Sequence, residues 1–342
     1  MFCALCTSTL ISSSIYHEHN AQTKRNTMEK KTMKAGSNLE KVLSSGAFAV
    51  TAELGPPKSA DPEVIIKKGK ILSGYADAVN ITDNQTAIVR MSSIAAGAIL
   101  LREGLPEPVM QMVTRDRNRI AMQSDILGAS ALGIKNILCL AGDHQCHGNH
   151  PGSKNVYDID SIQLVAMVKA MRDSKVVQCG EEIEGVAPSM FIGSASTPLG
   201  DPKEFRAIRL AKKVNAGADF IQTQAVYDVP AFAKWMEQVR DMGLHEKTHI
   251  LVGIIPIKSS GMARYMDSSV PGVIVPDEIM ERMKGLKGKK AGEEGIKIAI
   301  ELIHQVREIE GVHGVHIMAI EWEDRVPEIV EGAGLLPRPT LS

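Results

Sequence analysis

Aromatic side chains are scarce in this chain of 342 residues: Phe, Tyr and Trp make up 4% of it, whereas Met occurs 17 times and Gly 29 times. The hydrophobic core must therefore consist mainly of aliphatic side chains and methionine. An aliphatic, glycine-rich core is typical of (β/α)₈ barrels, whose interior is filled by branched aliphatic residues. The composition leaves open whether the few aromatic residues lie in the core or at a binding site.

Cysteine is also scarce, and long apolar runs and an excess of one charge are absent. Five cysteines, an odd number, argue against a secreted disulfide scaffold and predict a cytoplasmic protein. No stretch of 18 apolar residues occurs, so we expect no transmembrane helix. The 39 Lys and Arg nearly balance the 40 Asp and Glu, which argues against a nucleic-acid or membrane partner and favours a small-molecule ligand.

The first 37 residues differ from the rest of the chain. They are rich in Ser, Thr, His and Lys, and they contain Met28 and Met33 as alternative starts. Cys3 and Cys6 form a CxxC, but a structural zinc site would require a second pair. The apolar stretch is interrupted by Ser and Thr and follows no basic region, so it makes a poor signal peptide. We interpret residues 1–37 as a disordered leader or a wrongly assigned start, and residues 38–342 as one domain.

From Asn38 onward, short β-type runs alternate with helical segments. The expected strands are Ala47–Leu54, Ala78–Asp83, Pro108–Thr114, Asn136–Gly142, Ser189–Ser196, Phe220–Val226, His249–Ile257 and Val315–Ile320. The expected helices are Pro62–Ser73, Met91–Glu103, Asn118–Leu132, Ser161–Arg172, Pro202–Asn215, Val229–Asp241, a stretch from Ser259, and Arg325–Gly332. Eight strands, each followed by a helix, predict a (β/α)₈ TIM barrel in the α/β class, whereas a doubly wound sheet would normally stop near six strands.

Local signals mark several helix ends. Asp61-Pro62 and Asp201-Pro202 each combine an N-cap residue with proline at the first helical position, and Gly133 and Gly217 are C-terminal glycines. The long segment Pro276–His304 predicts two helices. We expect its basic, glycine-rich stretch, residues 284–295, to be the solvated turn between them, in preference to an anion site.

Functional residues of a barrel lie at the carboxyl ends of its strands. Glu53 ends the first expected strand. In an aliphatic barrel mouth its pKa would be raised by desolvation, which suits a general acid near neutral pH. A structural ion pair with a barrel Arg or Lys would use the same residue, and the sequence does not decide between these two roles.

Two further strand ends carry polar residues. Residues 80–85 (NITDNQ) could hydrogen-bond a flat heterocycle, but a turn rich in Asx residues would have the same letters. An 18-residue loop from Asp143 to Asp160 follows the fourth strand, and loops of this length are usually functional. It contains zinc-ligand residue types between Asp143 and His150, but on one loop without a second cluster, so we expect no metal site.

The second half of the chain offers a candidate phosphate site. Small residues from Gly193 to Thr197 would let a ligand approach the backbone, and Arg206, Arg209 and Lys213 share a face of the next helix. A solvated helix face and a phosphate-bearing cofactor are both compatible with this spacing. On the sixth strand, Gln222 and Gln224 point the same way, and their amides could read the edge of a pterin or nicotinamide.

Several of these segments resemble the methylenetetrahydrofolate reductase family. They are TAELGPP (51–57), RDRNR (115–119), LAGD (140–143), YDIDS (157–161), LAKKVNAGADFIQTQAVYD (210–228) and GIIPI (253–257). The resemblance runs from about Asn38 to Gly332. It implies a flavin-containing barrel, with FAD favoured over FMN, that reduces 5,10-methylenetetrahydrofolate to 5-methyltetrahydrofolate.

The resemblance also implies roles for individual residues. Glu53 matches the general acid that helps to open the five-membered ring, and hydride would come from reduced flavin. Asp143 matches a carboxylate between flavin and pterin, and Gln224 an amide that contacts folate and nicotinamide in turn; Tyr227, next along the strand end, is a further substrate-binding candidate. The flavin-binding positions are Thr82, Gly142, Asp143, Tyr157, Gly193, Thr197, Lys212 and Lys213, with Arg209 on the same helix.

Three positions depart from the family pattern. Trp322 stands where a relative has an arginine for the folate tail, Met262 stands where an amide is expected, and QAVYD replaces consecutive aromatics. NAD(P)H is therefore one candidate electron donor, and an iron–sulfur partner subunit is the other. A pterin-binding methyltransferase barrel is a rival function, and a homo-oligomer is a further candidate assembly. We expect the ring-stacking surface to include Tyr157, Tyr227 and Trp322.

Overall fold

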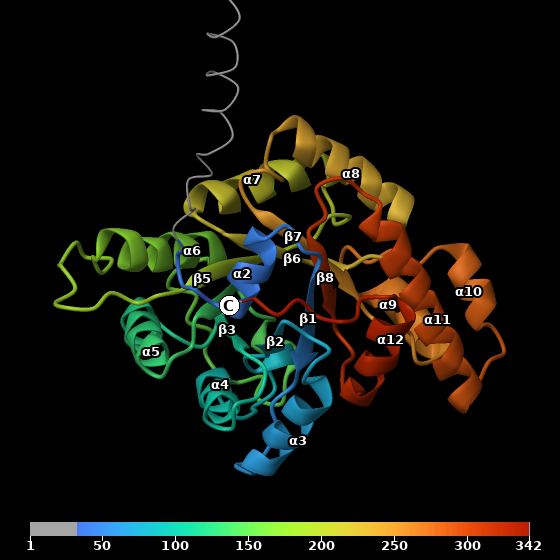
Figure 1. The fold of residues 1–342 in the computed structure, drawn as a ribbon, viewed down its shortest axis with the longest axis horizontal. Coiled ribbons are helices and arrows are strands. Elements are labelled where there is room, and N and C mark those ends of the chain that lie inside the picture. The colour runs from blue at the N-terminus through green and yellow to red at the C-terminus, as the bar shows by residue number, and fades with distance from the viewer. Residues whose placement is uncertain (1–32, 342) are drawn as a thin grey trace, which may run out of the picture. The chain divides into compact units, whose positions relative to one another are not determined.

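The computed structural model describes residues 33–341, which contain a closed barrel of eight parallel strands in chain order (Figure 1). The strands are β1 (Ala49–Leu54), β2 (Ala78–Ile81), β3 (Pro108–Val113), β4 (Asn136–Leu140), β5 (Phe191–Ser196), β6 (Phe220–Ala225), β7 (His249–Ile254) and β8 (Gly314–Ile317). β1 pairs with β8, which closes the sheet. The predicted (β/α)₈ barrel is confirmed, with most strands one to three residues shorter than expected.

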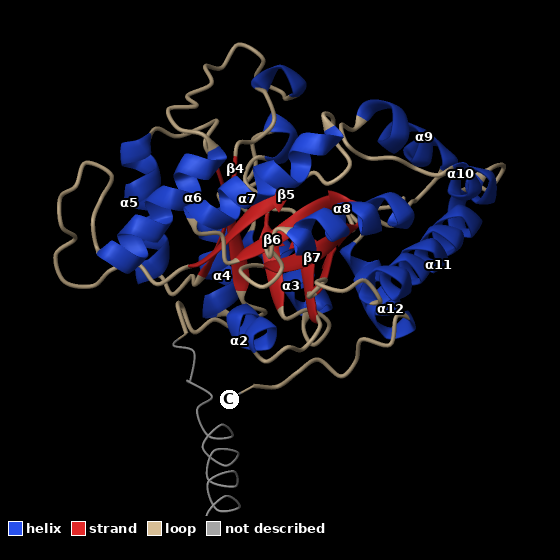
Figure 2. Ribbon diagram, turned by 90° about the horizontal axis from the view of Figure 1, so that it is seen from above, coloured by secondary structure: helices blue, strands red, loops and turns tan. Residues whose placement is uncertain are grey.

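Helices surround the sheet and connect successive strands (Figure 2). They are α2 (Asn38–Ser44), α3 (Pro62–Leu72), α4 (Ser93–Arg102), α5 (Arg119–Ala131), α6 (Ser161–Lys169), α7 (Arg206–Ala216), α8 (Val229–Asp241), α9 (Ser260–Ser269), α10 (Asp277–Met283), α11 (Gly288–Arg307) and α12 (Val326–Gly332). The expected cap at Asp61 is confirmed, since its side chain accepts a hydrogen bond from the Glu63 N–H. Gly217 caps α7 with a φ of 118°.

Helix α2 closes the amino-terminal end of the barrel, which we call the floor. Its side chains Leu39, Val42 and Leu43 pack with the lowest layer of the barrel interior. That layer includes Phe191 and Phe220, whose stacked rings have centroids 5.2 Å apart. These two aromatic residues therefore belong to the core and not to a ligand site.

The folded part begins slightly earlier than expected. We assigned residues 34–37 to the leader, but the backbone N–H groups of Lys34, Ala35 and Gly36 all donate to the Glu40 carboxylate. Ser37 caps α2 and is fully buried. This backbone is fixed because one buried carboxylate satisfies three otherwise unpaired donors. Residues 1–32, with the rest of the expected leader and its CxxC, lie outside the described residues.

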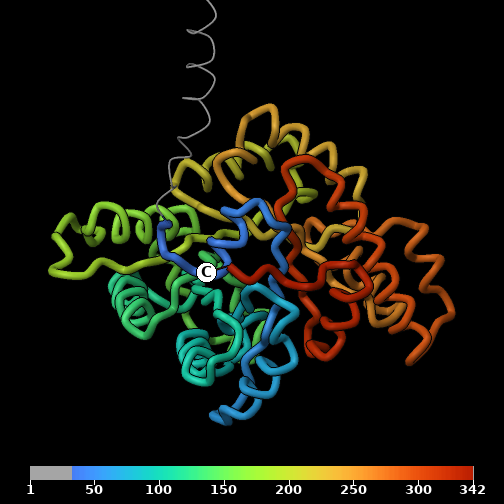
Figure 3. The backbone as a smooth tube through the Cα atoms, in the orientation of Figure 1, coloured from blue at the N-terminus to red at the C-terminus, as the bar shows by residue number. Residues whose placement is uncertain are grey.

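The C-terminal segment crosses the same floor beside α2 (Figure 3). Arg338, only about a tenth exposed at its side chain, forms an ion pair with the buried Asp77 at 2.5 Å. The same guanidinium donates to the Phe48 carbonyl at 2.8 Å. Asp77 also accepts a hydrogen bond from the Val50 N–H, so it links the C-terminal segment to β1. Both described ends of the barrel chain therefore meet at the floor, opposite the mouth.

A polar layer lies inside the barrel between the floor and the mouth. The Gln222 amide donates to Asn80 at 3.0 Å and to the Thr51 hydroxyl at 3.1 Å, and accepts from Asn80 at 2.6 Å. Thr51 Oγ1 lies 3.0 Å from Nδ1 of His316. These four buried side chains satisfy one another. Gln222 was a candidate for reading the edge of a ligand. In the structure its amide is bonded to Asn80 and Thr51 inside the barrel.

Burial of His316 has a consequence for acid stability. Desolvation lowers the pKa of His316 from 6.5 to about 3. The unfolded chain takes up this proton as pH falls below 6.5 and the folded chain does not, so stability is lost on acidification. We expect His316 to contribute a loss on the order of 3 kcal/mol between pH 6.5 and 4, read by urea unfolding as the difference between the unsubstituted protein and His316→Gln, because Glu53 titrates in the opposite sense over the same range. His304→Gln, at an exposed site, is the control; an unchanged pH slope in His316→Gln would contradict the assignment.

Two local expectations were wrong. Asp201-Pro202 does not start a helix, because Pro202 has extended backbone angles (φ −72°, ψ 130°) and a short 3₁₀ turn, Lys203–Phe205, precedes α7. The turn after α10 is also shorter than residues 284–295, since α11 already begins at Gly288. Gly295 lies within α11, and the position requires glycine because a Cβ there would come within 1.7 Å of the Ile257 carbonyl oxygen.

Candidate functional site

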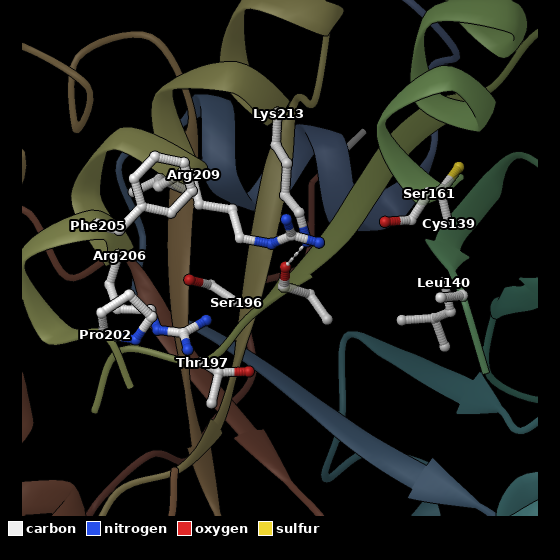
Figure 4. Close-up of a pocket in the computed structure, with 13 residues that line it drawn as sticks. Cys139, Leu140, Ser161, Ser196, Thr197, Pro202, Phe205, Arg206, Arg209 and Lys213 are labelled. Atoms are coloured by element: carbon white, nitrogen blue, oxygen red, sulfur yellow. Dashed lines mark hydrogen bonds between the residues drawn. The ribbon is translucent and has the colours of Figure 1, made fainter. Parts of the chain in front are cut away.

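A cationic pocket opens at the carboxyl ends of β4 and β5, with a volume of about 470 Å³ (Figure 4). It is lined by Cys139, Leu140, Ala141, Ser161, Ala195, Ser196, Thr197, Pro202, Phe205, Arg206, Arg209, Leu210 and Lys213. Arg206, Arg209 and Lys213 extend from α7 toward Ser196 and Thr197 (Figure 4). Three basic side chains and no acidic one line this pocket, so its charge suits a phosphate-bearing ligand.

Lys213 is the buried cation of the pocket. Its side chain donates to the Ala195 carbonyl, and the residue is only 7% exposed. Burial, with a further contribution from Arg209, lowers the pKa of Lys213 to about 8. A buried ammonium with a cation beside it is stabilised when an anion binds next to it. These donors therefore fit the phosphate groups of the flavin cofactor that the family resemblance implies.

Lys212 takes a different position from its neighbour. It is exposed and does not line the pocket, and its Nζ lies 5.4 Å from the centroid of the Phe205 ring. Successive residues on a helix point about 100° apart, so the pair cannot face one pocket together. Of the two lysines expected to bind the cofactor, only Lys213 is directed into the cationic pocket.

Glu53 lies near the end of β1, at the mouth of the barrel, as expected. Its pKa is raised from 4.5 to about 7, mainly by burial and further by the carboxylate of Glu323. Lys68 and Arg90 oppose the rise. A carboxyl group that is half protonated at neutral pH can both donate and accept a proton there, as a general acid requires.

The basic residues near Glu53 are tied to the backbone that follows it. Lys68 on α3 donates to the Gly55 carbonyl at 3.1 Å and pairs with Glu323 at 2.6 Å. Arg90 donates to the Pro56 carbonyl at 3.0 Å. Neither Lys68 nor Arg90 is hydrogen-bonded to Glu53 itself. Glu53 is therefore not part of the structural ion pair considered as the alternative. Sequence reasoning missed Lys68 and Glu323.

The loop after β4 brings several predicted residues together. Asp143 is exposed, and its carboxylate accepts from the Thr86 N–H at 3.0 Å. Tyr157 is 39% exposed, and its hydroxyl donates to the Gly142 carbonyl at 3.3 Å. Thr82, buried just after β2, donates to the Gln85 side chain at 2.9 Å. The structure thus places Asp143, Tyr157 and Gly142 in one loop, with the Asp143 carboxylate tied to the loop after β2.

The RDRNR segment acts as a scaffold for these loops. Arg115, nearly fully buried, donates to the backbone carbonyls of Asp143 and Asn84. Arg117 forms an ion pair with the buried Asp83 at 2.7 Å. These contacts join the loops that follow β2, β3 and β4. The position of Asp143 therefore depends on Arg115, which holds its backbone.

Two predicted substrate-binding residues lie in different environments. Gln224 is half-buried at the end of β6, and its side-chain oxygen accepts from the Ala225 N–H at 3.0 Å. Tyr227 was expected at the mouth, but it is only 3% exposed and its hydroxyl donates to the Ile255 carbonyl at 2.9 Å. The strand ends at Ala225, so alternation no longer governs Tyr227, which packs in the core beneath the helices. Trp322 is partly exposed, between Lys258 and Arg325.

Gly193 has a packing reason of its own. A Cβ at this position of β5 would lie 2.2 Å from the Phe220 ring. We expect Gly193→Ala to lower the free energy of unfolding by roughly 2 kcal/mol, the usual scale for overpacking. Gly128→Ala on α5, where a Cβ meets nothing within 4 Å, is the matched control. Phe220→Leu should recover part of the loss in the Gly193→Ala background; no recovery would argue against this clash.

Two further properties concern residues 33–341. Within this range, no three His, Cys, Asp or Glu side chains are arranged to hold a metal ion, including those between Asp143 and His150. None of the helices in the same range combines the length and hydropathy needed to cross a membrane.

The closed barrel, the cationic pocket and the carboxyl group of Glu53 at the mouth define a (β/α)₈ barrel protein with a candidate ligand site at the carboxyl ends of the strands. Residues 38–334 match the family described as methylenetetrahydrofolate reductase. The chain belongs to the methylenetetrahydrofolate reductase family, as the sequence motifs predicted.

Curated relatives are similar to parts of the chain. Methylenetetrahydrofolate reductase 2 of Schizosaccharomyces pombe is 32% identical over 179 residues, which cover 51% of this chain and 26% of that protein. A probable methylenetetrahydrofolate reductase (NADPH) of Caenorhabditis elegans is 22% identical over 312 residues, covering 87% of this chain and 44% of that protein. The aligned part thus spans less than half the length of either relative.

A solved structure supports the fold. It is a Clostridium thermocellum protein described as binding two copies of 5-methyl-5,6,7,8-tetrahydrofolic acid. The TM-score is 0.60 with 13% sequence identity, and the match covers 87% of this chain and all of that one. At this identity the likeness concerns the barrel fold.

Proposed function

We propose that this chain is an oxidoreductase that reduces 5,10-methylenetetrahydrofolate to 5-methyltetrahydrofolate with a bound flavin. The observation that carries the proposal is Glu53, a carboxyl group with a pKa of about 7 at the mouth of a barrel of this family. A carboxylic acid kept partly protonated at neutral pH is what opening the five-membered ring of the substrate demands. A barrel that only bound folate would not require a proton donor at this position.

The cationic pocket is the proposed site of the flavin phosphates. Lys213, Arg209 and Thr197 line it, and Arg206, which the helix spacing placed on the same face, is a further candidate outside the family positions. When bound, a flavin supplies the hydride that reduces the one-carbon unit. Gly142, Tyr157 and Thr82 remain proposed flavin contacts, whereas Gly193, which packs against Phe220 of the floor, and the exposed Lys212 are the weakest candidates of the set.

The remaining residues act on the folate. Glu53 gives its proton to the ring nitrogen of the substrate as the ring opens. The Asp143 carboxylate, held by its loop at the mouth, would accept hydrogen bonds from the pterin. The half-buried amide of Gln224 would release the Ala225 N–H and read the edge of the same ring. Tyr227 is not proposed as a contact, because its hydroxyl and ring are both buried.

Cofactor extraction tests the proposal directly. Purified full-length protein should carry a yellow cofactor, or bind added flavin, and mass spectrometry should distinguish FAD, which we favour, from FMN. With its flavin reduced, the protein should convert methylenetetrahydrofolate into the methyl form. A protein that binds neither flavin would overturn the proposal, and methyl transfer without flavin would favour the methyltransferase alternative.

The electron donor needs a separate assay. Because Tyr227 is buried, the end of β6 offers no exposed tyrosine at the position where we expected a nicotinamide ring to stack. This observation favours an iron–sulfur partner over NAD(P)H. We expect reduced viologen dye to reduce the bound flavin at least tenfold faster than NADH or NADPH does; equal rates with a nicotinamide would assign the donor to NAD(P)H.

A further inference from the structure

A partly buried ion pair joins α3 to the turn that follows β8, and both of its groups act on Glu53. Glu323 lies in the short turn Glu323–Arg325 that follows β8, and it is 5% exposed. Its carboxylate is 2.6 Å from Nζ of Lys68, whose side chain is 21% exposed on α3. Removing one partner of a pair this well shielded from water leaves an uncompensated charge, so it costs more than breaking a surface pair.

Lys68 makes a second contact that involves the strand of Glu53. Its Nζ donates to the Gly55 carbonyl at 3.1 Å, two residues after Glu53. One ammonium group therefore links the end of β1 to the turn after β8. Together with the pairing of β1 and β8, this link fixes the backbone at the end of β1 and therefore the backbone position of Glu53.

Three charged groups from different elements act on Glu53: Glu323 after β8, Lys68 on α3 and Arg90 in the loop after β2. Arg90 is itself held by the Pro56 carbonyl and lies 3.7 Å from the exposed Glu321. Only Glu323 carries the same charge as ionised Glu53. A like charge nearby favours the protonated carboxyl, and the two cations oppose it.

We propose that the Lys68–Glu323 ion pair positions Glu53 and shapes its surroundings: Lys68 holds the backbone after β1, and Glu323, held by Lys68, adds a like charge to the environment of the Glu53 carboxyl group. The catalytic part of this inference rests on the proposed function, in which Glu53 is the general acid. Glu323 and Lys68 are positioning residues, since neither donates a proton to the substrate.

Unfolding measurements test the coupling without flavin or substrate. The difference in unfolding free energy between the unsubstituted protein and Glu53→Gln, followed from pH 4 to 9, reports the midpoint at which folded Glu53 titrates. In a Glu323→Gln background this midpoint should fall by at least about half a pH unit. Asp324→Asn, the same change at the exposed neighbouring residue, should leave it in place. An equal midpoint in the Glu323→Gln and unsubstituted backgrounds would overturn the proposal.

Kinetics test the consequence for the reaction. The alkaline limb of methylenetetrahydrofolate reduction should move to lower pH in Glu323→Gln by the same amount as the unfolding midpoint. Lys68→Met should slow this step about tenfold, while Lys68→Arg, which keeps a cation and a donor, should restore most of the rate. Loss of rate in Lys68→Met with no rescue by arginine would argue against positioning.

The two proposals fail separately. If the unsubstituted protein binds no flavin and reduces no folate, the proposed function is wrong, yet the unfolding measurements still decide whether Glu323 acts on Glu53. If the protein is active but the midpoint does not move, only the ion-pair inference is wrong. Should Lys68→Met fail to fold, the Glu323→Gln series carries the test, because it leaves the Lys68–Gly55 hydrogen bond in place.

Discussion

Replacing Glu53 with glutamine should slow the reduction of methylenetetrahydrofolate a hundredfold or more, the usual scale for the loss of a general acid. Glutamine keeps the size and the hydrogen-bonding ability of the protonated side chain but cannot release a proton. In stopped-flow experiments with pre-reduced protein, flavin reoxidation by the substrate should show the loss. In the unsubstituted protein the same rate should fall as pH rises through about 7, since the acid form of Glu53 is then lost.

The control for this prediction is the other half of the reaction. Flavin reduction by dye or nicotinamide needs no proton from Glu53, so Glu53→Gln should change it less than threefold. A matching loss in flavin reduction would assign Glu53 to cofactor binding instead. Unchanged folate reduction would show that another group donates the proton.

Replacing Lys213 with methionine should weaken flavin binding about tenfold to a hundredfold, the loss expected for one charge-assisted hydrogen bond. Methionine preserves much of the buried volume but leaves the pocket without its shielded cation. Titration of apoprotein with flavin, followed by fluorescence quenching, measures the affinity. For the unsubstituted protein the affinity should decline as pH rises above about 8, because free Lys213 then loses its proton.

Lys212→Met is the matched control for Lys213. It removes the same charge from the adjacent residue, which is exposed and lies outside the pocket lining. We expect less than a threefold effect from it. Equal losses in the two variants would show that net charge, and not the pocket, governs affinity. A large loss only in Lys212→Met would place the phosphates on the other face of α7.

The barrel could be predicted because strand and helix signals alternate regularly along the chain. Position relative to a strand end also predicted Glu53 correctly at the mouth, since β1 runs straight into Gly55-Pro56-Pro57. The same rule failed for Tyr227, because β6 ends at Ala225, two residues before it. The register of β6 against β7 also shifts between Gln222 and Ala225. A sequence pattern does not reveal where such a shift occurs.

Other parts of the site arise only from tertiary packing. Lys68 and Glu323 are 255 positions apart, and no local pattern links a helix lysine to the turn after the last strand. The contrast between Lys212 and Lys213 follows the helix spacing, which already placed Lys213 on one face with Arg206 and Arg209, whereas the family positions did not separate the two lysines. The scarcity of aromatic residues did not by itself locate a binding site, because two of the few, Phe191 and Phe220, lie in the floor of the barrel.

The sealed floor determines how the protein can be handled and how it can meet a partner. The described C-terminal segment is bound there through Arg338, on the side of the barrel away from Glu53 and the cationic pocket. An affinity handle added after Ser342 would therefore leave the mouth unobstructed. A pull-down that tests for the proposed electron-donating subunit should thus use C-terminal immobilisation, which leaves the barrel mouth open to solution.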